Sequence, residues 1–136
     1  MNSSATRIHT LGARATPARI AVLDLLLLAD HALSHHEVET ALAAHGFDRV
    51  TLYRVLDWLV ETGLAHRITE NDRVFRFNAS HMERNHPAHA HFRCEGCGRV
   101  FCLDSAPVAT PSLPPGFIGH QADLRISGKC SDCAKA

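Results

Sequence analysis

Residues 89–102 read HAHFRCEGCGRVFC, a run that predicts two short strands joined by a Cys-x-x-Cys turn. The turn bends so that both of its sulfurs, those of Cys94 and Cys97, face one point. A second pair of the same spacing, Cys130 and Cys133, follows further along the chain. Four thiolates form the tetrahedral ligand set that structural zinc prefers. We therefore predict one structural zinc ion per chain, bound by these four cysteines.

The alternatives for the paired cysteines are a disulfide and a redox-active Cys-x-x-Cys. The chain has five cysteines, an odd number that does not suit a closed set of disulfides. Its first residues are polar, unlike a signal peptide, and its longest apolar run, Val22–Ala29, is interrupted by Asp24 and too short to span a membrane. We therefore expect a cytoplasmic protein with no membrane partner, in which cysteines stay reduced and bind metal. A redox role lacks the strand-to-helix context that it needs.

The same segment predicts a second metal site on the strands that flank the turn. Residues two apart on a strand share a face, so His89 and His91 point the same way. If the hairpin is symmetric about the turn, position 89 lies opposite 102 and position 91 opposite 100. Cys102 then faces His89 directly and His91 diagonally. The alternative is a buried, apolar Cys102 beside solvated histidines.

A fourth ligand for this site must come from elsewhere in the chain. We favour His66, with His31 or His35 as alternatives. His66 belongs to the first half of the chain, whereas the other three ligands belong to the second. Metal bound by all four would therefore fix the angle between two domains and favour one conformer of the chain.

The first half of the chain predicts three helices followed by a hairpin. Helix starts are marked by Thr16-Pro17, by a capping box that begins at Ser34, and by Asp48. Two β-type runs follow at 64–69 and 73–77. This order is typical of a winged helix-turn-helix, so the expected fold class is α+β. The expected parts are a winged-helix domain at 1–78, a hinge at 79–87 and a small, mostly β, zinc-stapled domain at 88–136.

Taken together, these motifs resemble the ferric uptake regulator family over nearly the whole chain. The shared stretches are RATPAR at 14–19, VTLYRVL at 50–56, VFRF at 74–77, HAH at 89–91, CEGCG at 94–98 and GKCSDC at 128–133. The resemblance implies a dimeric bacterial repressor, with an N-terminal winged helix and a C-terminal dimerisation domain. Such repressors are not enzymes. They occupy operators of metal-uptake or stress genes when they carry metal.

The resemblance also implies DNA contacts, in a chain whose formal net charge is zero. Tyr53 and Arg54 would contact bases in the major groove, since arginine suits guanine edges and a tyrosine ring can meet a thymine methyl. The other residues expected at the DNA are Arg14, Arg19, Arg49 and Thr51. The alternative is that Tyr53 and Arg54 lie on an ordinary solvated helix face. Because there is no overall positive charge, any contact must come from a local patch.

Departures from the family pattern point to the zinc uptake regulator branch. Cys102 stands where members that sense iron or peroxide usually carry a carboxylate. Arg76 stands where zinc-sensing members commonly place a cysteine, whereas His66 matches a ligand position of those members. Three imidazoles and one thiolate suit zinc better than ferrous iron, because thiolate is soft and no carboxylate remains. We therefore expect a second, regulatory zinc ion and a zinc-responsive repressor.

A homodimer of this chain must rely on strands. The prolines within residues 106–115 exclude a regular helix of normal length where the family has its dimerisation helix, which leaves Leu124 and Ile126 as candidates. Three other functions stay open: an iron- or peroxide-responsive regulator, a zinc-ribbon interaction module or metal chaperone, and a zinc hydrolase. A hydrolase keeps one zinc position for water, and four protein ligands would fill it. No small organic substrate is expected.

Overall fold

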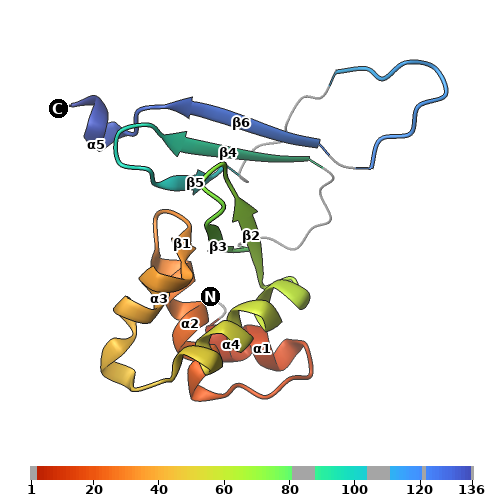
Figure 1. Ribbon diagram of the computed structural model, residues 1–136. Coiled ribbons are helices and arrows are strands. Elements are labelled where there is room, and N and C mark those ends of the chain that lie inside the picture. Colours follow the sequence, from red (N-terminus) through yellow and green to blue (C-terminus); the bar gives the residue numbers. More distant parts are fainter. Residues whose placement is uncertain (1–2, 81–87, 104–110, 121, 136) are drawn as a thin grey trace. The chain divides into compact units, whose positions relative to one another are not determined.

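The computed structural model describes residues 3–80, 88–103, 111–120 and 122–135. The chain divides into two compact units, Met1–Met82 and Glu83–Ala136, and the expected α+β class is confirmed (Figure 1). The first unit contains α1 (Ser4–Thr10), α2 (Pro17–Leu28), β1 (Leu33–Ser34), α3 (His35–Ala41), the 3₁₀ turn η1 (Ala43–His45), α4 (Arg49–Glu61), β2 (Ala65–Thr69) and β3 (Phe75–Ala79). The second unit contains β4 (Ala88–Cys94), β5 (Val100–Cys102), β6 (Ala122–Gly128) and α5 (Ser131–Ala134).

Each of the three predicted helix starts is confirmed by a side chain that caps it. The hydroxyl of Thr16 accepts a 3.3 Å hydrogen bond from a backbone N–H in the first turn of α2. Ser34 and Glu37 form both halves of a capping box at α3. Asp48 accepts a 2.7 Å hydrogen bond from a backbone N–H in the first turn of α4. Caps of this kind stabilise a helix by about 1 kcal/mol each, and they fix where α2 and α4 begin.

The core of the first unit lies where the helices pack on one another and on the small sheet β1-β3-β2. Its fully buried large side chains include Leu23 of α2, Leu56 of α4 and Phe77 of β3. Helix α1 is an addition to the predicted helices. It is capped by Ser3 and contributes Ile8, which is fully buried, to the core. A single buried apolar residue in a polar heptapeptide gives no periodicity from which the helix could be predicted.

The predicted hairpin of the wing is present, but its second strand starts two residues late, at Phe75 rather than at 73. Arg73 adopts a left-handed conformation with φ of 62°, and its N–H donates to the carbonyl of Glu70 at 3.0 Å. A left-handed residue cannot continue an extended strand, so the turn lasts through Val74. Strand β3 then runs on through Ala79, which is fully buried. The expected hinge therefore does not begin at 79, and its residues 81–87 lie outside the described part of the chain.

The second unit is built on a three-stranded sheet in the order β5-β4-β6 (Figure 1). Strands β4 and β5 are antiparallel, whereas β4 and β6 run parallel. The described apolar residues that are buried in this unit are Ala90, Cys94, Val100 and Cys130. A core this small is rarely sufficient to hold a unit of this size, which is the situation in which small domains use a metal or a disulfide.

The symmetric register predicted for the β4–β5 hairpin is wrong by two residues. His91, rather than His89, lies opposite Cys102, and Arg93 lies opposite Val100. The turn is longer than the symmetric estimate, because the Cys94 N–H donates to the Arg99 carbonyl at 2.9 Å. Residues 95–98 therefore form the loop, and each residue of β4 pairs with the β5 residue two positions later than predicted.

The prolines within residues 106–115 predicted that this segment forms no regular helix. Its residues 111–115 are described, and they belong to a stretch, 111–120, that forms neither helix nor strand. Residues 106–110 lie outside the described part of the chain. On β6, Leu124 and Ile126 are 44% and 42% exposed. These are the apolar side chains that sequence reasoning named for a strand-based dimer. Within the described ranges, no helix has both the length and the apolar character to cross a membrane.

Candidate metal centre and nucleic-acid interface

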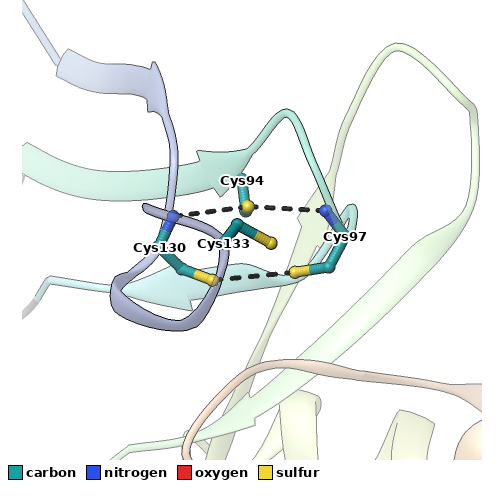
Figure 2. A group of neighbouring side chains, drawn as sticks. All are labelled: Cys94, Cys97, Cys130 and Cys133. Atoms are coloured by element: carbon teal, nitrogen blue, oxygen red, sulfur yellow. Dashed lines mark hydrogen bonds between the residues drawn. The ribbon is translucent and has the colours of Figure 1, made fainter. Parts of the chain in front are cut away.

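Four cysteine side chains of the second unit meet at one point (Figure 2). Cys94 ends β4, Cys97 lies in the turn that follows, and Cys130 and Cys133 lie at the start and near the end of α5. Their sulfur atoms all lie within 4.8 Å of one another. Because β6 runs parallel to β4, with Gly128 opposite Cys94, the second pair emerges beside the first. The predicted cysteine set is therefore brought together.

The spacing of the sulfurs fits a tetrahedral zinc ion. Zinc–sulfur bonds of about 2.3 Å correspond to sulfur–sulfur edges of about 3.8 Å. The Cys97 and Cys130 sulfurs lie 3.9 Å apart. None of the five cysteines, all of which are described, is in a disulfide. The cluster can hold one metal ion with all four thiolates as ligands.

Hydrogen bonds within the cluster lower the pKa of some of its cysteines and raise that of another. Backbone N–H groups of Gly96, Cys97 and Cys130 donate to the Cys94 sulfur at 3.3, 3.4 and 3.3 Å. These bonds, that from Cys130 above all, lower the pKa of Cys94 to about 5. Hydrogen bonds to the sulfurs of Cys94 and Cys130 raise the pKa of Cys133 to about 12. Four thiolates thus need a divalent cation among them, and its binding displaces the Cys133 proton at neutral pH.

Arg99 connects the two cysteine pairs, and sequence reasoning missed it. Its Nε donates to the Cys97 sulfur at 3.2 Å, and a terminal nitrogen donates to Asp132, between the second pair, at 3.4 Å. The Arg99 backbone N–H, followed by its side chain, lowers the pKa of Cys97. A cation two residues after a Cys-x-x-Cys pair was the available signal for this partner.

Gly96 has no side chain, and Cys133 occupies the space that a Cβ there would take. A Cβ added at Gly96 would lie 2.9 Å from the Cys133 sulfur and 3.2 Å from its Cβ. We expect Gly96→Ala to displace that ligand and to speed zinc release by at least about tenfold, the lower range for changes that disturb ligand placement. The rate of zinc transfer from the loaded protein to a chromogenic chelator measures this effect.

Gly98→Ala is the matched control for this prediction. A Cβ there would have nothing within 4 Å, but Gly98 has a φ of +77°. Alanine should therefore strain the hairpin by about 1–2 kcal/mol without moving a sulfur. We expect a lower melting temperature and a zinc-release rate near that of the wild type. Equal release from both variants would contradict the steric role of Gly96.

Two of the predicted regulatory ligands face each other within the second unit. His91 on β4 pairs directly with Cys102 on β5, and their ligand atoms lie within 4.8 Å of each other. Both side chains are half-buried. An imidazole and a thiolate at this separation can bind the same ion, because both ligands reach zinc at 2.0–2.3 Å, a bond length of about half that distance.

The other predicted ligands are placed by their own elements. His89 lies two residues before His91 on β4, and its backbone pairs with Asp123 of β6. His66 lies on β2 of the first unit, with its Nδ1 3.4 Å from the Ser80 hydroxyl. Of the alternatives, His31 has its Nδ1 2.6 Å from the Asp30 carboxylate. His66 and His89 therefore stay predictions.

The predicted base-reading residues lie on the outer face of α4. Tyr53 is 40% exposed and Arg54 is exposed, while Leu52 and Val55 of the same helix are buried in the core. The apolar stripe of α4 thus determines that these two side chains face solvent. Their position leaves them available to a nucleic acid.

A hollow of about 360 Å³ lies beside them, lined in part by Arg14, Arg19, Thr51 and Arg54. Four of the predicted DNA-contacting residues therefore share one concave surface. Arg49 is not among the residues that line it. Its Nε instead donates to the Glu39 carboxylate at 2.9 Å.

The Tyr53 ring packs on another ring, and Trp58 lines the hollow; sequence reasoning missed both features. The His35 ring lies 4.1 Å from the Tyr53 ring and 4.8 Å from the Phe77 ring. Burial lowers the pKa of His35, which favours the neutral imidazole. His35 thus packs on a predicted base-reading residue, and its role as an alternative metal ligand stays a prediction. Trp58 lies one helical turn after Arg54, and that spacing was a signal for its place on the same side of α4.

A winged helix with an exposed arginine-rich face, in one chain with a cysteine cluster that can hold metal, defines a metal-responsive DNA-binding regulator. The model of the Ferric uptake regulator family matches residues 10–112. The chain belongs to this family, whose members are transcriptional regulators rather than enzymes.

Individual relatives agree with this assignment. The chain is 29% identical over 130 residues to the zinc uptake regulation protein of Escherichia coli (strain K12), a match covering 90% of this chain and 74% of the relative. The structure of holo XcZur has a TM-score of 0.61 at 26% identity and covers 92% of this chain and 89% of its own. A zinc uptake regulator complexed with zinc and DNA has a TM-score of 0.66 at 24% identity, with coverage of 95% and 89%.

Proposed function

We propose that this regulator is a zinc-responsive repressor of metal-uptake genes. In this proposal it binds operator DNA in the cytoplasm as a homodimer when its regulatory site carries zinc. One structural zinc ion per chain occupies Cys94, Cys97, Cys130 and Cys133. The similarity to a relative named for zinc uptake, over 90% of this chain, supports zinc as the signal.

The observation that carries the proposal is the pairing of His91 with Cys102. A thiolate is a soft ligand, and an imidazole–thiolate set without a carboxylate favours zinc over ferrous iron. Both side chains are half-buried, so a metal ion bound there is partly shielded from water. Neither residue belongs to the four-cysteine cluster, so the pair forms a separate candidate site for the regulatory ion.

The proposal takes His89 and His66 as the remaining ligands. His89 lies two residues before His91 on β4, and residues at this spacing on a strand are expected to share a face. His66 is a half-buried imidazole on the wing strand β2. With ligands drawn from both units, zinc would select one arrangement of the DNA-binding unit from a wider set. In a dimer, that selection sets the spacing of the two α4 helices.

DNA binding and dimerisation complete the proposal. Exposed Tyr53 and Arg54, beside an arginine-lined hollow, support major-groove binding. The shared fold with a regulator solved together with zinc and DNA supports it as well. Exposed Leu124 and Ile126 on β6 support a dimer built on strands.

The test is a zinc titration of DNA binding for the wild type and Cys102→Ser, in a buffer that fixes free zinc. The probe is a duplex selected from random sequences on the zinc-loaded wild type. We expect Cys102→Ser to need at least about 100-fold more free zinc, since losing a direct ligand should cost no less than disturbing its supporting shell. The variant should still retain one tightly held zinc per chain.

Cys102→Asp is the matched variant that tests the signal. A carboxylate is harder than a thiolate, so this change should weaken the response to zinc and strengthen that to ferrous iron. An unchanged zinc response in Cys102→Ser would refute the regulatory site. A wild type that responds equally to both metals would instead favour an iron- or peroxide-responsive regulator.

A further inference from the structure

The hollow beside α4 contains a guanidinium that is held in place by its surroundings. The Cζ of Arg19 lies 3.8 Å from the centroid of the Trp58 ring. A terminal nitrogen of the same side chain donates to the carbonyl of Arg14 at 2.8 Å. Stacking of this kind covers the face of the guanidinium and leaves its in-plane N–H donors directed outward. Arg19 is thus oriented before any ligand arrives.

The hollow has the chemistry of an anion site. Arg14, Arg19, Arg54 and Thr51 line it, and no carboxylate is among its lining residues. The nearby Asp48 carboxylate, which caps α4, accepts hydrogen bonds from Thr51 and interacts with Arg54, which leaves Arg14 and Arg19 as the main cationic lining. By contrast Arg49, which does not line the hollow, is bound to Glu39. The guanidiniums of Arg14 and Arg19 in one concavity attract a phosphate group, which accepts several N–H donors at once.

We propose that this hollow binds one backbone phosphate of double-stranded DNA and that Trp58 is the positioning residue that orients Arg19 for it. The inference rests on the proposed DNA binding and adds to it a residue that does not itself touch DNA. The indole holds Arg19 through a cation–π contact, so the phosphate meets an ordered donor rather than a flexible one. Tyr53 and Arg54 then read the adjacent bases from a fixed register.

Salt-dependent binding of a labelled 30-base-pair duplex of arbitrary sequence tests the proposal on the intact, zinc-loaded protein. Backbone contacts do not depend on sequence, so no operator is needed. Arg19→Ala should weaken binding and reduce the slope of log Kd against log salt by about one per bound chain. Arg19→Lys keeps the charge, and therefore most of the slope, but loses the planar stacking.

Trp58→Leu removes the π face while it keeps an apolar side chain in the partly buried position. We expect Kd to rise by roughly 3- to 30-fold, the range of a cation–π contact. Trp58→Phe retains a ring and should recover most of the affinity. In the Arg19→Ala background, Trp58→Leu should add nothing further, a coupling that a merely structural role would not produce. Thermal melting and zinc content identify any variant that fails to fold.

The chain has one tryptophan, so its fluorescence reports on the hollow directly. Duplex DNA should change the Trp58 emission at micromolar concentration, whereas inorganic phosphate should need far more. Saturation by inorganic phosphate at the same concentration would overturn the assignment to DNA. Independent effects of Trp58→Leu and Arg19→Ala would overturn the positioning role but leave the proposed function standing. A wild type that binds no duplex with any metal would overturn both.

Discussion

Replacing Cys94 with serine should release the structural metal and unfold the second unit. Cys94 is fully buried, and its sulfur accepts three backbone N–H bonds. Two of the four described apolar residues that are buried in this unit are themselves cysteines of the cluster. Structural zinc contributes about 10–16 kcal/mol of folding free energy in small zinc domains, more than a core of this size can replace. Metal analysis together with residue-resolved hydrogen exchange measures both losses.

The first unit provides an internal control in that experiment. The core of this unit consists of its own residues, from Ile8 to Ala79. Its backbone amides should therefore stay protected from hydrogen exchange in Cys94→Ser. Cys102→Ser is the matched cysteine control, and it should retain one zinc ion and the protection of β4. Retention of zinc and of β4 protection in Cys94→Ser would show that the cluster does not stabilise this unit.

The combined change of Tyr53→Ala and Arg54→Ala should abolish discrimination between a selected operator and a scrambled duplex. Each good base contact is worth about 1–3 kcal/mol, so losing two contacts in one chain should reduce the affinity ratio by at least about 30-fold, and a dimer loses more. Binding to the scrambled duplex should fall far less, because most backbone contacts remain. Competition between the two duplexes at a fixed salt concentration gives the ratio.

Glu61→Ala is the control on the same helix. Glu61 is exposed and ends α4, two turns beyond Arg54. We expect this variant to discriminate as the wild type does. A double variant that still discriminates would revive the interpretation of α4 as an ordinary solvated face, and with it an interaction module or metal chaperone.

Local interactions explain why much of the fold was predictable from sequence. Thr16, Ser34 and Asp48 each bond within the first turn of their own helix, so a few neighbouring residues determine the start. The wing turn was not predictable in the same way. Arg73 is left-handed without being glycine, and its neighbours give no signal for that conformation.

The same distinction applies to the sites. Sequence spacing was enough to group the four cysteines, and strand periodicity put His89 and His91 on one face. Which of the two histidines meets Cys102 depends on how many residues the turn takes up, and hydrogen bonds within the turn decide this. The stacking of Arg19 on Trp58 joins two helices that are distant in sequence, so periodicity along either helix could not reveal it.

The parallel pairing of β4 with β6 has a consequence for how the protein is made. Paired residues lie 34 positions apart in the chain, as from Ala88 to Ala122. Such pairing must close a long loop before any ladder bond forms, which slows folding. With the proposed structural zinc, an ion bound first by Cys94 and Cys97 would capture the second cysteine pair and close that loop. The folding rate of the second unit would then rise with the concentration of free zinc, so zinc supply would control how fast newly made chains become able to act.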